Sequence, residues 1–196
     1  MSYVLCDYER VKLEFPEFQS VMENLRRRLI EKAEADWSPL RFSGGISSTA
    51  GQFSETTIIP SLFKDNAGNR LTTWKQLFTS TGSQTIMTGV GSGGVIPEDF
   101  KVGLVGLAFL DPVLRVSEIK MQISDRKLPR INIEEAMVYN KPAIIFEDGY
   151  ILDEETSFEL VGYVMTQGYQ RIKLIGIQLN RVPNKLQVTD TGAALT

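Results

Sequence analysis

The chain has 196 residues, 42% of them hydrophobic, and a formal net charge of −3. A chain of this length buries one sizeable core, so a single domain over residues 1–196 is predicted. The weak negative charge excludes long-range electrostatic attraction to nucleic acid or to an anionic membrane surface.

The residue types that carry most reactive chemistry are rare or missing. The sequence has no histidine, which removes Ser-His and Cys-His nucleophile pairs, histidine metal ligands and the usual general base near neutral pH. A single cysteine, Cys6, excludes an internal disulfide and cysteine-rich zinc sites. We therefore expect no catalytic residue, no cofactor and no enzymatic activity.

Two targeting features are also missing. No charged and then apolar N-terminal segment resembles a signal peptide, so synthesis in the cytoplasm is expected. The longest mainly apolar run, residues 102–110, is much too short to cross a bilayer as a helix. Membranes are accordingly not among the predicted partners.

The chain begins with two segments of different character. Residues 1–15 predict an N-terminal arm or edge strand. Residues 16–37 predict a long amphipathic helix, since Pro16 suits the first helical position and Glu17 lies in the first turn, where the helix dipole favours negative charge. Apolar residues recur there at steps of three and four: Phe18, Val21, Met22, Leu25, Leu29, Ile30 and Ala33.

Arg26, Arg27 and Arg28 form a basic run on the side of this helix away from the apolar stripe. One interpretation is a patch that binds phosphate or nucleic acid without sequence specificity. The other is a solvated face that pairs with acidic neighbours in the helix or on adjacent subunits. The nearby glutamates favour the second interpretation, so nucleic acid is at most a non-specific partner.

Residues 38–182 predict a β-rich core with glycine-rich loops at 43–56 and 79–97. The second loop contains a formal G-x-G-x-x-G pattern, but a proline and then a strand-like run follow it, where a dinucleotide site requires a helix. Residues 71–78 are predicted as a short helix. Residues 102–110, apolar on both faces, predict a central strand covered on both sides.

Two later stretches alternate with period two and then slip by one residue. Residues 114–123 slip at Ser117-Glu118, and the second strand of residues 158–182 slips near residues 174–176. One extra residue in a strand produces such a slip, so a β-bulge is predicted in each. Because bulges increase curvature, the two strands are predicted to be neighbours in one strongly bent sheet.

Residues 147–155 are acidic and include Glu147-Asp148-Gly149, which is typical of a hairpin turn. Clustered carboxylates suit a hard cation such as calcium, and Asp148, Asp153 and Glu155 are the candidate ligands. The other interpretation is a solvated hairpin that resists edge-to-edge pairing, which the lack of EF-hand spacing favours.

The predicted fold class is mainly β, or α+β by content: an antiparallel β-sandwich or jelly-roll-like core with one N-terminal helix and extended arms. The C-terminal arm covers residues 183–196. The arms and the loop at 43–56 are expected to supply contacts between subunits. The candidate contact residues are Tyr3, Val11, Leu13, Phe53, Leu186 and Val188.

This layout, mainly over residues 100–182, resembles virion coat and other phage-like structural proteins built on a jelly roll or a related β-sandwich. The resemblance implies self-assembly into a shell or tube as a virus or phage-like capsid protein. Its implied partners are copies of itself and other virion or assembly proteins, and its implied location is a virion or another large assembly.

A non-catalytic β-sandwich module that recognises a glycan or a protein is the alternative function. It fits the strand content and the acidic segment at 147–155. A glycan site usually presents clustered exposed aromatic side chains, whereas Trp37 and Trp74 are expected in the core or at a helix end.

Overall fold

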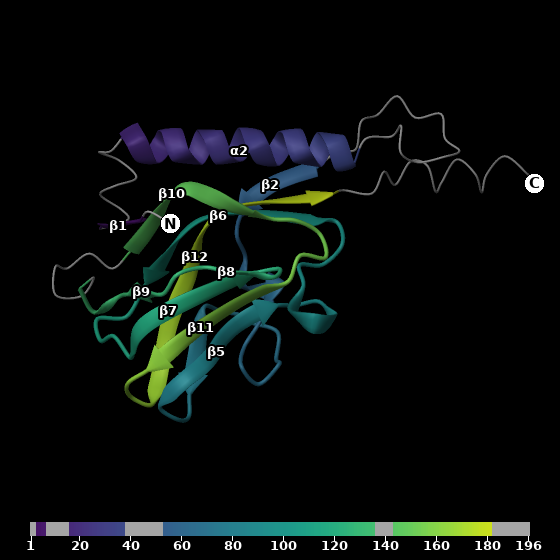
Figure 1. Cartoon of the computed structure of the whole chain (residues 1–196). Coiled ribbons are helices and arrows are strands. Elements are labelled where there is room, and N and C mark those ends of the chain that lie inside the picture. The colour runs from purple at the N-terminus through teal and green to yellow at the C-terminus, as the bar shows by residue number, and fades with distance from the viewer. Residues whose placement is uncertain (1–2, 7–15, 38–52, 136–142, 182–196) are drawn as a thin grey trace, which may run out of the picture.

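The computed structural model describes residues 3–6, 16–37, 53–135 and 143–181 (Figure 1). Within these ranges the chain forms two six-stranded sheets and one long helix, α2 (Pro16–Asp36). All strand pairs described are antiparallel. The prediction of an antiparallel β-sandwich with an N-terminal amphipathic helix is confirmed.

Sheet A has the order β1-β10-β6-β12-β2, and β4 pairs with the first part of β12. Strand β12 is the longest described strand and therefore contacts three partners along its length. The strands of sheet A are β1 (Tyr3–Cys6), β2 (Phe53–Thr57), β4 (Lys75–Phe78), β6 (Phe100–Phe109), β10 (Ala143–Leu152) and β12 (Gly168–Arg181).

Sheet B has the order β3-β5-β11-β7-β8, and β9 also pairs with β7. Two 3-10 turns, η2 (Pro60–Leu62) and η3 (Ser92–Gly94), lie in its connections. The strands of sheet B are β3 (Phe63–Lys64), β5 (Gly82–Gly89), β7 (Val116–Ile123), β8 (Arg126–Lys127), β9 (Ile131–Asn132) and β11 (Phe158–Val164).

One series of strand pairs is nested along the chain. The innermost pair joins β7 to β8 and β9, and successively wider pairs join β6 to β10, β5 to β11, and β2 to β12. Successive pairs alternate between the two sheets. A long hairpin wrapped in this way gives the jelly-roll form of the β-sandwich.

The main hydrophobic core lies between the two sheets. Alternate residues of each strand point inward, as the burial of alternate positions in β4 and β11 illustrates. Strand β6 differs, because its residues 101–109 are all buried, as predicted for a central strand covered on both faces. The largest aromatic side chains of the core are Phe63, Phe78, Phe146 and Phe158.

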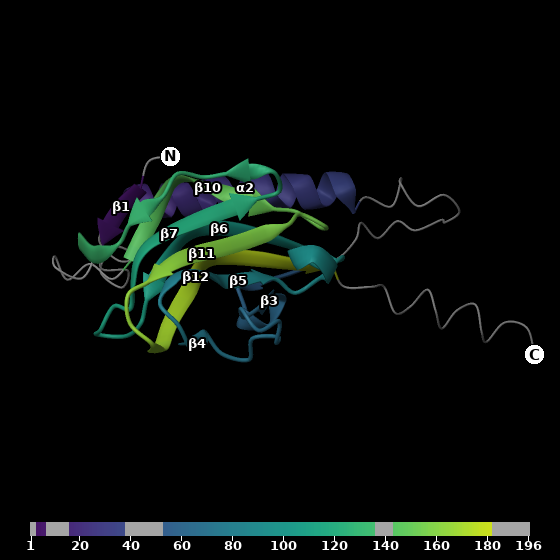
Figure 2. The same cartoon turned by 60° about the horizontal axis from the view of Figure 1, so that its bottom comes forward.

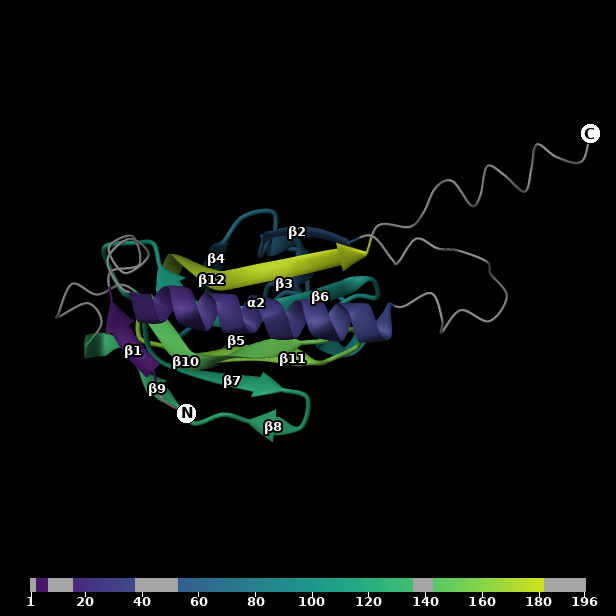
Figure 3. The same ribbon diagram turned by 90° about the horizontal axis from the view of Figure 1, so that it is seen from above.

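Helix α2 covers the outer face of sheet A (Figures 1 and 3), where it contacts β10, β6 and β12. Its apolar stripe packs in two clusters, with Phe18 against Ile145 and Ile175 near the N-terminal end, and Leu29 against Ile177 and Leu179 nearer the C-terminal end. The outer face of sheet B carries no helix in the described ranges (Figure 2). The stripe predicted from the sequence therefore faces the sandwich.

Gly103 of β6 allows this close approach. A Cβ atom at Gly103 would lie 3.1 Å from two atoms of the Leu25 side chain. A Cβ at this position would require the Leu25 side chain to shift by a few tenths of an ångström, and a larger side chain would require more. The contact matters because burial of each large apolar side chain contributes about 1.5–3 kcal/mol.

Both predicted bulges are present. The β12–β6 register shifts between Ile175 and Gly176, and the β11–β7 register skips Ser117. Gly176 has φ of 156°, and a Cβ there would lie 1.9 Å from the carbonyl oxygen of Gly103, so the bulge requires glycine. The predicted pairing of the two bulged strands is wrong, because β12 belongs to sheet A and β7 to sheet B. Each bends its own sheet.

Three local predictions are also wrong. Residues 71–78 do not form a helix, because their last four residues are β4, paired with β12. Much of the predicted loop at 79–97 is strand β5, whose inner face joins the core. Glu147-Asp148-Gly149 is not a hairpin turn. It is an irregularity inside the single strand β10, where the pairing with β6 shifts between Ile145 and Tyr150.

The predicted arms fall mostly outside the described residues, as do residues 43–52 of the first predicted loop. The described part of the N-terminal arm, β1, pairs with β10 of its own chain and forms an edge of sheet A. Residues 53–56 of the same loop lie in β2.

Candidate functional site

Exposed apolar side chains gather at one end of the sandwich. Six of the seven large hydrophobic residues that are exposed in the described ranges lie on or beside three connections at this end, the β4–β5, β6–β7 and β11–β12 turns. We call them the apolar end: Leu77, Leu110, Val113, Tyr163, Met165 and Tyr169. The seventh, Ile59, lies apart from them, between β2 and η2.

Strand pairing brings β4, the β6–β7 loop and β12, which carry several of these side chains, close together. Leu77 of β4 is the register partner of Tyr169 of β12. Leu110 donates its backbone N–H to the carbonyl of Arg171, two residues further along β12, which brings the β6–β7 loop beside the same strand. The Lys75 ammonium lies 3.8 Å from the centre of the Tyr169 ring, which is cation–π geometry.

Polar contacts hold the loops of the apolar end in place. Arg171 donates to Asp111 at 2.8 Å, and the Asp111 carboxylate also accepts the backbone N–H of Arg171. Arg115 donates to the carbonyl oxygens of Tyr169 at 3.0 Å and Gln167 at 2.5 Å. The buried Gln170 amide accepts the Arg115 backbone N–H at 2.8 Å. These hydrogen bonds therefore fix the positions of the loops that carry the apolar residues.

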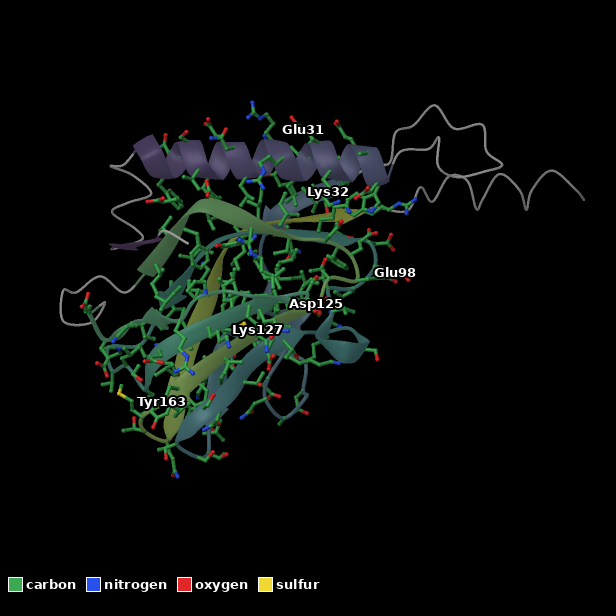
Figure 4. All side chains as sticks on the ribbon, viewed as in Figure 1. Glu31, Lys32, Glu98, Asp125, Lys127 and Tyr163 are labelled. Carbon is green, nitrogen blue, oxygen red and sulfur yellow. The ribbon has the colours of Figure 1, made fainter. Side chains whose placement is uncertain are left out.

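The opposite end of the sandwich is acidic. Its turns, at residues 95–99, 124–125 and 153–157, contain no lysine or arginine. We call their outer carboxylates the acidic end: Glu98, Asp99, Asp125, Glu154 and Glu155. Figure 4 shows Glu98 and Asp125 at this end and Tyr163 near the other.

A polar hollow of about 320 Å³ lies on the outer side of sheet B, close to the acidic end. Thr88 of β5, Gln122 of β7 and Glu159 of β11 line it together with Gly93, Gly94, Ser157 and Phe158. The Glu159 carboxylate accepts a hydrogen bond from Thr85 at 2.7 Å. Hydroxyl, amide and carboxylate groups on one face can bind a small polar ligand.

An ionic cluster joins the C-terminal end of α2 to the sandwich. The Lys101 ammonium is 2.8 Å from Asp36 and also contacts Asp153. Lys32 lies 2.7 Å from the other Asp153 oxygen and 3.3 Å from Asp36. The Trp37 indole donates to the Glu154 carboxylate, so two elements of the sandwich bind the end of the helix.

The lysines set the pKa values of the two aspartates. The hydrogen bond from Lys101 lowers the pKa of Asp36 below its ordinary value. Burial acts to raise the pKa of Asp153, but the hydrogen bonds from Lys101 and Lys32 more than offset it, and the pKa is lowered. The hydrogen bond to Asp153 raises the pKa of Lys32. Asp36, Asp153 and Lys32 are therefore charged near neutral pH.

The candidate calcium ligands do not form one site. Asp153 is engaged by the two lysines, Glu155 is exposed in the next turn, and Asp148 lies at the irregularity in β10. No group of three or more side chains that could hold a metal ion occurs in the described part of the chain.

The predicted subunit contacts have mixed positions. Val11, Leu13, Leu186 and Val188 lie outside the described residues. Tyr3 is in β1, opposite Phe146 of β10. Phe53 of β2 is half-buried beside the Trp37 ring, 6.4 Å between ring centres, so part of its surface is covered within its own subunit.

The arginine run makes contacts within the chain. Arg26 bonds to Glu55 of β2 at 2.8 Å, Arg27 lies 4.0 Å from Glu31, and Arg28 donates to the carbonyl of Asp148 at 3.2 Å. These contacts are those of a solvated helix face that also binds the sheet below it.

Comparison with protein-family models, curated proteins and solved structures found no match. Among the described residues, no helix combines the length and apolar character needed to cross a membrane.

The apolar end was not predicted from the sequence. Its only local signal was the presence of Tyr163, Met165 and Tyr169 around a polar turn, where exposed aromatic residues are unexpected.

Proposed function

We propose that this chain is a structural subunit that assembles with copies of itself into a shell or tube, as a virus or phage-like virion protein does. The apolar end is the observation that carries the proposal. Exposed apolar groups on a protein surface are usually scattered, and a concentration of them marks a contact surface. The virion part of the proposal is an analogy with the capsid domains that share the jelly-roll form.

The composition of the apolar end also supports a protein partner. Tyrosine, methionine and arginine are enriched in protein interfaces, and tyrosine and arginine are frequent among the residues that dominate binding energy. Tyr163, Met165 and Tyr169 lie here beside Arg115 and Arg171. Because hydrogen bonds already fix the surrounding loops, association orders few additional groups.

The first test is the size of the native particle, measured by light scattering and negative-stain microscopy. We expect a large regular assembly. Val113→Asp, which places a charge on the most exposed residue of the apolar end, is expected to raise the concentration needed for assembly about tenfold or more. Ile59→Asp is the matched control, because Ile59 is the exposed apolar residue outside the apolar end.

Two results contradict the proposal. One is a wild-type protein that stays monomeric at millimolar concentration. The other is an assembly that responds equally to Val113→Asp and Ile59→Asp, since this shows that the apolar end has no special role. Circular dichroism and thermal unfolding of both variants confirm that any change is not caused by misfolding.

The hollow on sheet B favours a second candidate, a module that binds a glycan. Lectin domains also use the jelly-roll form, and the lining groups hydrogen-bond well to hydroxyls. A glycan array is the test. Glu159→Gln and Gln122→Ala are expected to abolish binding, whereas Lys120→Ala, on the same strand as Gln122 but outside the lining, retains it. No binding by the wild-type protein contradicts this candidate.

A further inference from the structure

We propose that the apolar end of one subunit binds the acidic end of a second copy, so that the subunits associate head to tail. This inference rests on the proposed function, since it names the partner surface for the self-assembly described above. It follows from the charges at the two ends and from the distance between them.

Two cations within the apolar end are not neutralised by any described carboxylate. Arg115 bonds to neutral oxygens, those of Tyr169, Gln167 and Thr166. Lys75 contacts the Tyr169 ring and makes no ion pair within the described ranges. Lys75 is exposed and Arg115 is half-buried, so both can attract an opposite charge on a partner.

The acidic end has the complementary excess. Glu98, Asp125 and Glu155 are exposed and make no side-chain hydrogen bond or ion pair with another described residue. Asp99 pairs with Arg181 at 3.6 Å, and Glu154 accepts the Trp37 indole N–H. Three carboxylates thus remain for a partner.

The two ends cannot neutralise each other within one subunit. Strand β11, from Phe158 to Val164, runs from the acidic end to the apolar end. Its length is about 20 Å at the usual rise per residue. Charges this far apart are screened at physiological salt, where the Debye length is about 8 Å. The ends also face in different directions, as the positions of Glu98 and Tyr163 in Figure 4 show.

A contact between two apolar ends is disfavoured by the same charges. A two-fold contact brings each surface against its own copy, so Lys75 and Arg115 of one subunit would meet a surface with the same excess of positive charge. Like charges at an interface are strongly unfavourable. A head-to-tail contact is heterologous, and such contacts generate rings or open helical filaments. Both forms suit a shell or tube.

Charge reversal tests the pairing. Lys75→Glu alone and the double variant Glu98→Lys, Asp125→Lys are each expected to weaken assembly about tenfold or more. The triple variant, with all three changes in one chain, is expected to recover part of the assembly. The reversed charge at position 75 again meets the opposite charge at positions 98 and 125, whereas Arg115 and Glu155 keep their signs. Arg27→Glu and Glu31→Lys, on the solvent side of α2, are the matched controls and leave assembly unchanged.

A cross-link reports the orientation directly. In a Cys6→Ser background, chains carrying Val113→Cys are mixed with chains carrying Glu98→Cys and treated with a short bis-maleimide. The head-to-tail contact yields dimers that contain one chain of each kind. Dimers formed by Val113→Cys chains alone indicate contact between apolar ends and overturn the inference.

The outcomes separate the two proposals. Wild-type protein that does not assemble overturns the proposed function and the head-to-tail contact with it. Wild-type protein that assembles, but whose triple charge variant does not recover, overturns the head-to-tail contact alone and leaves self-assembly standing.

Discussion

Lys101 is the one charged side chain that is buried among the described residues, with 1% of its surface exposed. Its partner Asp36 lies in the last turn of α2, where the helix dipole disfavours a carboxylate. The ion pair with the buried Lys101 ammonium offsets the unfavourable interaction of Asp36 with the helix dipole. Lys101 also lies 5.1 Å from the Trp37 ring centre, so it contacts three residues at once.

Replacement of Lys101 by methionine is expected to lower the free energy of unfolding by about 3 kcal/mol, because two partly buried carboxylates lose their buried partner and keep only the partly exposed Lys32. Lys32→Met is the control. It removes a lysine from the same two carboxylates, but its side chain is 40% exposed, so a loss below about 1 kcal/mol is expected. Urea unfolding measures both. Equal losses contradict a special role for the buried lysine.

Two interpretations of Asp153 were open from the sequence, a metal ligand or part of a solvated hairpin, and the structure places its carboxylate against Lys32 and Lys101. A carboxylate among other acidic residues suggests a cation, and it does bind cations, but they are lysine side chains. Lys101 is 52 residues away in the sequence, and the helix supplies Lys32 from still further. Sequence spacing does not predict these contacts, because the residues come together only in the folded sandwich.

At the scale of elements, the helix was the most predictable part. Residues 16–37 carry a periodic signal that is local, and the helix observed, Pro16–Asp36, agrees with it. Residues 71–78 show the opposite case. The spacing of Trp74, Leu77 and Phe78 is compatible with a helix or with a strand. In the structure, residues 75–78 form a strand because they pair with β12. Tertiary contact overrides a weak local pattern.

Leu25→Ala is expected to destabilise the protein by about 2–5 kcal/mol, because Leu25 is fully buried and touches Gly103 and Gly149 of two strands beneath the helix. Ile30→Ala, at a half-buried position of the same helix, is expected to cost distinctly less. Chemical unfolding gives both values. A Leu25 variant no less stable than the Ile30 variant would show that α2 does not depend on this contact.

At the scale of the whole molecule, stability depends on pH through the ionic cluster. The pKa values of Asp36 and Asp153 are lowered by folding, from an ordinary value of 3.8. Their contribution is present above that value and is lost as pH falls through the folded-state pKa. Lys32 has the opposite sign: its contribution is present below its ordinary value of 10.5 and is lost as pH rises through its raised pKa.

Acidification from pH 6 to pH 3 is therefore expected to lower the urea midpoint of the wild-type protein. The decline is expected to be shallower for Lys101→Met, because removal of that lysine lets the aspartate pKa values return toward ordinary ones. Unfolding followed by tryptophan fluorescence at several pH values measures this. Parallel curves for the two proteins would show that other carboxylates dominate the pH dependence.

The sandwich itself could be predicted, and so could the bulges, because alternation and its slips are properties of single strands. Strand order could not. Residues 114–123 and 168–181 share the same pattern, yet they lie in different sheets, since a pattern records which side is buried and not which strand lies beside it. The apolar end could not be predicted either, because the pattern does not show which strands and loops lie side by side. Its members come from five separate strands and loops.

From the nested pairing we expect an order in which parts of the molecule form. Contacts close at growing separation, from Gln122 with Lys127, through Ala108 with Ala143, to Thr57 with Ile177. Widely separated pairs form slowly, because the intervening chain must first be brought together. The pairing of β4 with β12, which seats Leu77 beside Tyr169, belongs to the outermost layer. We therefore expect the apolar end to form late in folding. Under the proposed function, an incompletely folded chain would lack this contact surface.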